Sequence, residues 1–142
     1  MPAFAVPFSD DEVEVHRLIR HGEPLSDIIA ELDGNHTVNL RSPSGKTPLM
    51  TAAYYCRKDV IEALIKRGGV VNAIDERTGD TAAHYVTLSM SGHIKQCACL
   101  MALIEHEADI DLRNRDGYTV YELAAKNGNS DIGDTGDAVR YE

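Results

Sequence analysis

The stretch that decides the fold is Gly45-Lys46-Thr47-Pro48-Leu49-Met50-Thr51-Ala52-Ala53. Its Gly-x-Thr start returns 34 residues later as Gly79-Asp80-Thr81, and then 38 residues later as Gly117-Tyr118-Thr119. A short β-like piece precedes each copy by six or seven residues, centred on Asn39, Asn72 and Asp111. Two landmarks that recur in register at such a period are typical of a solenoid built from repeats.

Each Gly-x-Thr copy is followed by a helical pattern of apolar residues. In the first copy Leu49, Ala52, Ala53 and Cys56 lie on one face of a helix. Thr47 is placed to cap this helix, and Pro48 stands in its first turn, where a missing N–H is harmless. A second helix is predicted from Asp59 to Arg67, with Gly68-Gly69 as its stop.

These motifs resemble those of the ankyrin repeat family. The first copy differs from the family's T-P-L-H-x-A-A only by Met50 in place of His, and residues 67–73 resemble its G-A-x-V-N-A ending. The second copy keeps the His as His84, and the third, residues 119–125, keeps Thr and the Leu-Ala-Ala core. The resemblance covers roughly residues 38–128. It implies an all-α solenoid of helix-turn-helix units joined by short β-hairpin-like loops.

The pattern divides the chain into about four units, of which the outer two are caps. We expect an N-terminal capping unit at 9–37, full repeats at 38–70 and 71–109, and a C-terminal unit at 110–132. Residues 1–8 read as an apolar arm and residues 133–142 as a flexible tail. The second full repeat carries about five extra residues near 88–93, as either a longer helix or a bulged loop.

The capping units follow from weaker signals. A helix is expected from about Asp10 to His21, and Pro24 is expected to open a second helix at its first position. At the other end, the glycine-rich residues 133–138 form a poor helix, so the C-terminal cap is expected to be weak.

Composition narrows the functional classes. Twenty-three acidic against 14 basic residues give a formal charge of −9, which disfavours a nucleic acid or an anionic membrane as partner. No apolar run approaches the roughly 18 residues that a membrane span needs. Three cysteines without a disulfide pattern favour an intracellular, cytoplasmic protein, with the nucleus or a host-cell cytosol as alternatives.

The motifs of catalysis and of cofactor binding are missing. Ser44-Gly45-Lys46-Thr47 imitates the end of a P-loop, but Leu40 stands where the first glycine of that motif is required. His93 and Cys97 share a helical face, whereas Cys99 points away from Cys97, so a metal site is disfavoured. We therefore expect no enzyme, no cofactor and no metal.

The resemblance implies that a partner protein binds the concave face, which in this family consists of hairpin tips and the first helix of each repeat. Tyrosine and arginine, which are typical of binding hot spots, occur among the positions carried over. Together with Arg57, which is chosen for its charge, the predicted partner-binding residues are Lys46, Tyr54, Tyr55, Arg57, Arg77, Asp80, Leu88, Arg115, Tyr118 and Lys126.

Charge is spread unevenly along the chain. Residues 1–33 carry −6, whereas residues 34–74 carry +4 from Arg41, Lys46, Arg57, Lys58, Lys66 and Arg67, less two acids. An acidic segment of a partner is one expected ligand of this basic repeat, and a solvated surface without a partner is the alternative. The main prediction is a non-catalytic adaptor, either monomeric or weakly self-associating through its C-terminal end. The alternatives are a structural subunit that assembles through that end and a pathogen effector that binds a host protein.

Overall fold

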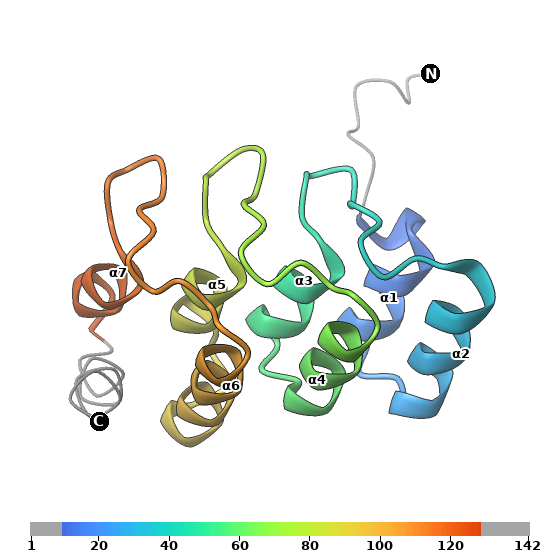
Figure 1. Ribbon diagram of the computed structural model, residues 1–142. Coiled ribbons are helices and arrows are strands. Elements are labelled where there is room, and N and C mark those ends of the chain that lie inside the picture. The colour runs from blue at the N-terminus through green and yellow to red at the C-terminus, as the bar shows by residue number, and fades with distance from the viewer. Residues whose placement is uncertain (1–9, 129–142) are drawn as a thin grey trace.

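The computed structural model of the protein describes residues 10–128 and confirms the all-α repeat architecture. Its helices follow a short 3-10 helix at Asp10–Glu12. They are α1 (Glu14–Arg20), α2 (Leu25–Asn35), α3 (Pro48–Tyr54), α4 (Lys58–Lys66), α5 (Ala82–Leu88), α6 (His93–Glu105) and α7 (Val120–Lys126). The odd-numbered helices form one row and the even-numbered helices a second row, with long loops projecting from the same side (Figure 1).

The projecting loops are hairpin-like, although no strand occurs within residues 10–128. One backbone bond closes each loop: Ser42 N–H to the Lys46 carbonyl at 2.8 Å, Asp75 to Asp80 at 2.8 Å, and Asn114 to Tyr118 at 3.0 Å. Successive loops are also joined, because the Arg115 N–H donates to the Thr78 carbonyl at 2.9 Å. The loops therefore form a connected ridge along one side of the stack.

The threonine of each Gly-x-Thr motif caps the helix that follows it. The side chains of Thr47, Thr81 and Thr119 accept hydrogen bonds from the third helical N–H. The reciprocal acceptor differs between the copies: Met50 Sδ at 3.4 Å, His84 Nδ1 at 3.1 Å and Glu122 Oε1 at 3.0 Å. A thioether, an imidazole and a carboxylate thus serve one capping position.

The core lies between the two rows of helices. Large aliphatic side chains are fully buried there and belong to one continuous cluster. They include Ile28, Ile61, Leu64, Leu100 and Leu103. The row of odd-numbered helices is the inner row. Small side chains let these helices approach one another, as expected for their place in the motif. The alanines in this group are Ala52, Ala53, Ala82, Ala83 and Ala124.

The insertion in the second full repeat is mainly a longer helix. α6 has 13 residues where α4 has nine. The connection before α6, residues 89–92, is only one residue longer than the connection before α4, residues 55–57. The buried Gln96 secures the added turn, since its Nε2 donates to the carbonyls of Val86 at 3.1 Å and Ser89 at 2.9 Å.

The N-terminal unit differs in detail from its prediction. The helix expected from Asp10 to His21 is interrupted at Val13, which caps α1 without a side-chain hydrogen bond. Pro24 precedes α2 instead of opening it. The predicted arm at 1–8, the tail at 133–142 and the C-terminal segment 129–132 lie outside the described residues. Within residues 10–128, no helix is long and apolar enough to cross a membrane.

Candidate functional site

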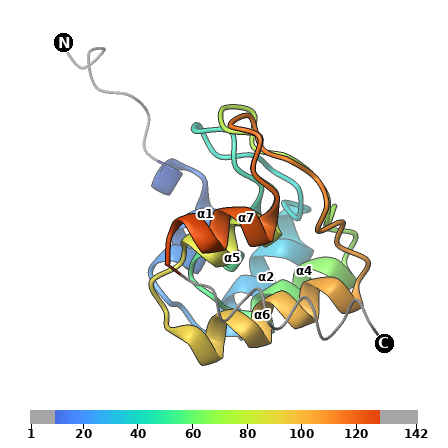
Figure 2. The same ribbon diagram turned by 90° about the vertical axis from the view of Figure 1, so that its left-hand side faces the viewer.

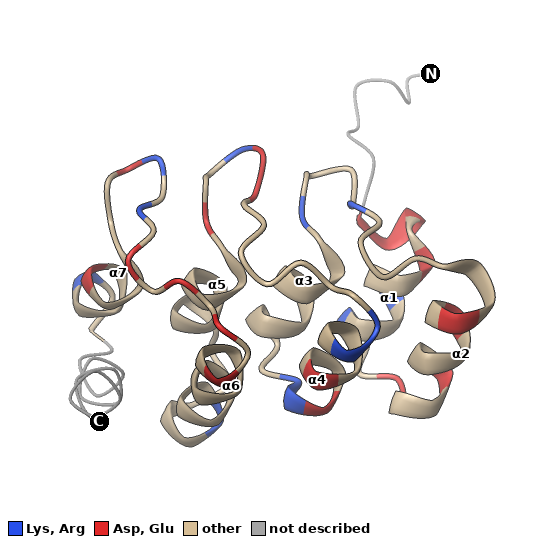
Figure 3. Ribbon diagram, viewed as in Figure 1, with Lys and Arg blue, Asp and Glu red and all other residues tan. Residues whose placement is uncertain are grey.

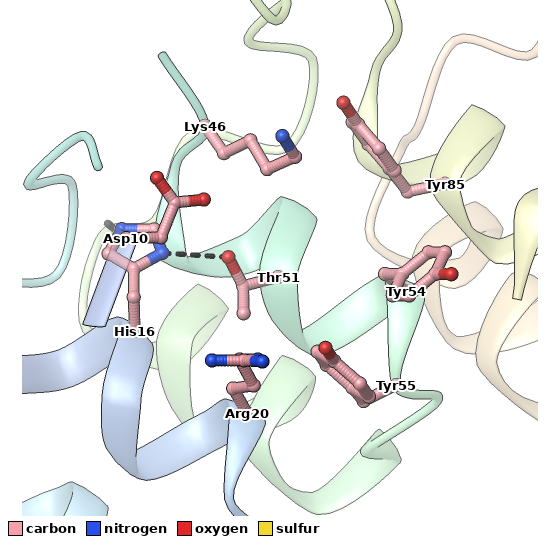
Figure 4. Close-up of a pocket in the computed structure, with 8 residues that line it drawn as sticks. All are labelled: Asp10, His16, Arg20, Lys46, Thr51, Tyr54, Tyr55 and Tyr85. Atoms are coloured by element: carbon pink, nitrogen blue, oxygen red, sulfur yellow. Dashed lines mark hydrogen bonds between the residues drawn. The ribbon is translucent and has the colours of Figure 1, made fainter. Parts of the chain in front are cut away.

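A pocket of about 350 Å³ opens between α1, α3 and α5, beneath the first hairpin loop (Figure 4). α1 supplies His16 and Arg20, and the 3-10 helix supplies Asp10. The other lining residues come from two repeats further along the chain: Lys46, Thr51, Tyr54, Tyr55 and Tyr85. Three consecutive units therefore build this one site, which we call the tyrosine pocket.

Three tyrosines form one wall of the tyrosine pocket. The ring of Tyr54 meets Tyr55 edge-on with centroids 5.1 Å apart, and meets Tyr85 in the same way at 6.4 Å. Tyr85 is buried, Tyr54 is half-buried and Tyr55 is 36% exposed. Edge-to-face packing holds the central ring between its neighbours, so the wall is ordered before any partner arrives.

A buried carboxylate fixes the position of Tyr85. The Tyr85 hydroxyl donates to Asp75 Oδ2, while Asp75 Oδ1 accepts from the Arg77 N–H at 2.7 Å. Burial, reinforced by this bond to Asp75, raises the pKa of the Tyr85 phenol above its ordinary value, so the phenol stays a donor. Lys46 Nζ lies 4.0 Å from Asp75 Oδ2 and 5.7 Å from the Tyr85 ring centre.

His16 forms the opposite wall and joins three elements. Its Nε2 lies 2.8 Å from the Leu40 carbonyl, which accepts a hydrogen bond from it. Its Nδ1 lies 2.7 Å from the Thr51 hydroxyl. Burial lowers the pKa of His16, against opposing contributions from the Leu40 bond and from Asp10. The folded protein therefore favours the neutral ring, whose Nδ1 accepts from Thr51.

His16 should make the protein less stable in mild acid. Because its pKa is lower in the folded state than the ordinary value of about 6.5, the unfolded chain binds the extra proton first. We expect the contribution of His16 to the free energy of unfolding to be fully present above that value. It should be lost as the pH drops through the lower, folded pKa. Urea denaturation between neutrality and mild acid measures this loss, and His16→Gln should flatten it. An equal slope in the variant would contradict the assignment.

A second pocket, also about 350 Å³, lies between the last two hairpin loops and the helices α5 and α7. Its lining residues are Arg77, Thr78, Asp80, Leu88, Asn114, Arg115, Asp116 and Leu123. Three of them bind within the fold. Asp80 is 6% exposed and accepts a hydrogen bond from Asn114 Nδ2 at 2.9 Å. Arg115 Nη2 donates to the Glu76 carbonyl of the neighbouring loop at 2.6 Å.

The predicted site residues therefore fall into separate groups. Lys46, Tyr54 and Tyr55 line the tyrosine pocket. Four others line the second pocket: Arg77, Asp80, Leu88 and Arg115. Tyr118 and Lys126 pair with each other at the last unit, where the Lys126 Nζ lies 4.9 Å from the Tyr118 ring centre.

Arg57 does not join these groups. It lies in the turn between α3 and α4, at the opposite end of the helices from the hairpin loops (Figure 1). Its Nη1 donates to the Glu23 carbonyl at 3.0 Å, and its Nη2 lies 3.3 Å from Asp59 Oδ2. The residue therefore ties α4 to the preceding unit.

The positive charges of residues 34–74 are dispersed over the first full repeat (Figure 3). Four of these side chains lie within 4.0 Å of an acidic group: Arg41 near Glu76, Lys46 near Asp75, Arg57 near Asp59, and Arg67 near Asp33. Lys46 alone of these four lines the tyrosine pocket.

Sequence reasoning missed five residues of the tyrosine pocket: Asp10, His16, Arg20, Thr51 and Tyr85. A usable signal exists for Tyr85, because it stands four residues after Thr81 as Thr51 stands four residues after Thr47. The repeat register therefore predicts that both point to the same face. No such register reaches α1, which lacks the Gly-x-Thr motif.

Within residues 10–128, no group of three or more His, Cys, Asp or Glu side chains is arranged to hold a metal ion. His93 Nδ1 and Cys97 Sγ lie 3.6 Å apart on α6, as their spacing predicts, while Cys99 is buried in the core.

Comparisons with known proteins agree with the fold. The family model described as ankyrin repeats (3 copies) matches residues 15–101. The chain is 34% identical over 67% of its length to rat ankyrin repeat and SAM domain-containing protein 6, and 27% identical over 78% to chicken nuclear factor NF-kappa-B p105 subunit. It is 32% identical over 64% to the Xenopus laevis inhibitor of Bruton tyrosine kinase. These matches span only 10%, 11% and 6% of the relatives' own lengths. The chain belongs to the ankyrin repeat family.

Proposed function

We propose that this chain is a non-catalytic adaptor that binds a partner protein on the face formed by the hairpin loops and the inner helices. Ankyrin repeats are generally protein–protein interaction modules without catalysis. The observation that carries the proposal is the tyrosine pocket, where three units present ordered aromatic side chains around an open volume of about 350 Å³.

The energetics of this pocket suit a single anchor side chain of the partner. Because its walls are already packed and hydrogen-bonded, little conformational entropy is lost when a ligand enters. Tyrosine provides a large contact area, and truncation of a hot-spot residue costs about 2 kcal/mol or more of binding free energy. We therefore place the main contact at Tyr54 and Tyr55, with the second pocket as an extension.

The charges at the tyrosine pocket favour an acidic group beside that anchor. Lys46 and Arg20 both line the opening, and Arg20 reaches it from α1 while its Nη1 pairs with Asp11 at 2.6 Å. Asp10 and Asp75 offset part of the positive charge, so acidic residues should steer and orient the partner more than they bind it. Arg57 is not part of this proposed surface.

A role in recognition agrees with the kinds of protein that the chain resembles. One of these relatives is named as the inhibitor of a kinase and another as a subunit of a nuclear factor. For this chain we infer a role inside the cell, in the cytoplasm, because its three cysteines, which all lie within residues 10–128, form no disulfide bond.

The proposal predicts that Tyr54→Ala weakens the binding of a concave-face partner about thirtyfold. Proteins captured by the wild type are identified by quantitative mass spectrometry, and the affinity of the main candidate is measured by calorimetry. Lys46→Glu, which leaves the core intact, should lower the association rate. Lys58→Glu at the start of α4 is the matched control, and we expect no effect of it.

Two results would contradict the proposal. One is equal affinity for the wild type and Tyr54→Ala, provided that circular dichroism shows both to be folded. The other is loss of the partner with Lys58→Glu alone, because that residue lies at the end of the helices away from the hairpin loops.

A further inference from the structure

The outer face of α6 carries an apolar stripe, of which Cys97 also packs against the core. Ile94, Cys97, Ala98 and Met101 follow one another at helical spacing, and we call them the α6 stripe. Ile94 is 82% exposed and Met101 is 36% exposed, while Ala98 is exposed and Cys97 half-buried. Met90, just before the helix, is 93% exposed. Large apolar side chains gathered on a surface in this way mark interaction sites.

The equivalent helix α4 shows that the α6 stripe is a departure from the repeat. Both helices end in the same bond, from Gly69 N–H to the Leu64 carbonyl at 2.8 Å and from Ala108 N–H to the Leu103 carbonyl at 3.0 Å. In this register the core positions agree, because Val60, Ile61 and Leu64 match Cys99, Leu100 and Leu103, and all six are buried.

The outer positions do not agree. In the same register, the charged residues Lys58, Asp59 and Glu62 of α4 correspond to Cys97, Ala98 and Met101 of α6. All three α4 residues are exposed, so water is the ordinary neighbour of this face of the repeat. The change from charged to apolar residues is thus confined to the surface and points to a surface that another molecule covers.

The α6 stripe is also rigid and accessible. The added turn of α6, which carries Ile94, is anchored to the end of α5 by the two hydrogen bonds of Gln96. Figure 2 shows α6 along the lower edge of the molecule, on the side away from the hairpin loops. A partner at this edge would leave the tyrosine pocket open.

We propose that the α6 stripe is the contact of a homodimer in which the α6 helices of two copies pack antiparallel. A two-fold axis that crosses the paired helices midway between positions 99 and 100 places Ala98 of each copy opposite Met101 of the other. A small side chain therefore faces a large one on both sides of the axis. The same axis sets the exposed Glu105 of each copy against the partner's N-terminal turn of α6, which bears Lys95 and a positive helix end. The face is therefore complementary to itself in both shape and charge.

Sedimentation velocity over a range of protein concentrations tests the proposal in reducing buffer. The wild type, of 15.6 kDa per chain, should shift toward twice that mass as concentration rises. Met101→Glu should raise the dimer dissociation constant at least about tenfold, because it places a charge at the centre of the contact. Glu62→Lys is the matched control in α4 and should change nothing. Cys97→Ser should still dimerise, which separates packing from disulfide formation.

A charge-reversal cycle tests the antiparallel pairing itself. Lys95→Glu and Glu105→Lys alone should each weaken the dimer about threefold, and the double variant should restore it. A wild type that stays monomeric at every concentration would overturn the proposal. So would a dimer that Met101→Glu leaves unchanged, because its contact would then lie elsewhere. Neither result bears on partner binding at the tyrosine pocket.

Discussion

Gly79→Ala is expected to destabilise the protein by about 3 kcal/mol, because two costs combine at this position. Gly79 has a φ of +75°, a conformation that an L side chain adopts only with strain. An added Cβ would also lie 2.9 Å from the backbone nitrogen of Arg115 and 3.0 Å from its Cγ. The substitution would therefore push apart two hairpin loops that the bond from the Arg115 N–H to the Thr78 carbonyl holds together.

Gly117→Ala provides the matched control for this prediction. Gly117 occupies the same place in the next hairpin loop with a φ of +88°, but an added Cβ there would meet nothing within 4 Å. We expect a cost of about 1 kcal/mol, from the backbone conformation alone. Urea denaturation of the three proteins measures both values. Equal losses would mean that contact between the loops contributes little at Gly79.

Asp75→Ala is expected to cost about 3 kcal/mol, because it leaves the buried Tyr85 hydroxyl and the Arg77 N–H without their acceptor. Asp75 is 1% exposed and accepts from the Tyr85 hydroxyl and from the Arg77 N–H. Without the carboxylate, the hairpin loses the bond from the Arg77 N–H to the Asp75 side chain, and Tyr85 loses the group that orients it. We therefore also expect weaker binding at the tyrosine pocket, measurable by calorimetry with the partner identified above.

Asp75→Asn separates the shape of the hairpin from its charge. The third hairpin loop carries Asn114 at the equivalent position, and its Oδ1 accepts from the N–H groups of Asp116 at 3.1 Å and Tyr118 at 2.9 Å. An amide should therefore keep the turn and cost only about 1 kcal/mol, from the weaker bond to Tyr85. If Asn proved as costly as Ala, the charge and its 4.0 Å approach to Lys46 would be the stabilising feature.

The repeat units follow directly from local sequence. Thr47, Thr81 and Thr119 each cap a helix because a hydroxyl three residues before an N–H can reach it without help from the rest of the fold. The helical apolar spacing after each motif likewise fixes which face is buried. The N-terminal unit departs from its prediction because α1 begins after Val13, which offers no side-chain cap.

The candidate site depends on distances that no single repeat specifies. Tyr54 and Tyr55 could be placed on the inner face by the repeat register, but their neighbours His16 and Arg20 come from a unit without the motif. Arg57, predicted from its charge, lies at the other end of the helices because it stands in the turn between α3 and α4. Its guanidinium binds the Glu23 carbonyl of the preceding unit there.

The sequence by itself determined that this protein is a stack of helical repeats, because capping, turn formation and helical periodicity act over a few neighbouring residues. Only the tertiary structure decided which side chains meet between repeats and which apolar residues stayed exposed. It also decided that the five added residues of the second full repeat mainly lengthen α6. These features depend on how successive units pack, and residues about 35 positions apart, such as His16 and Thr51, contact one another only after stacking.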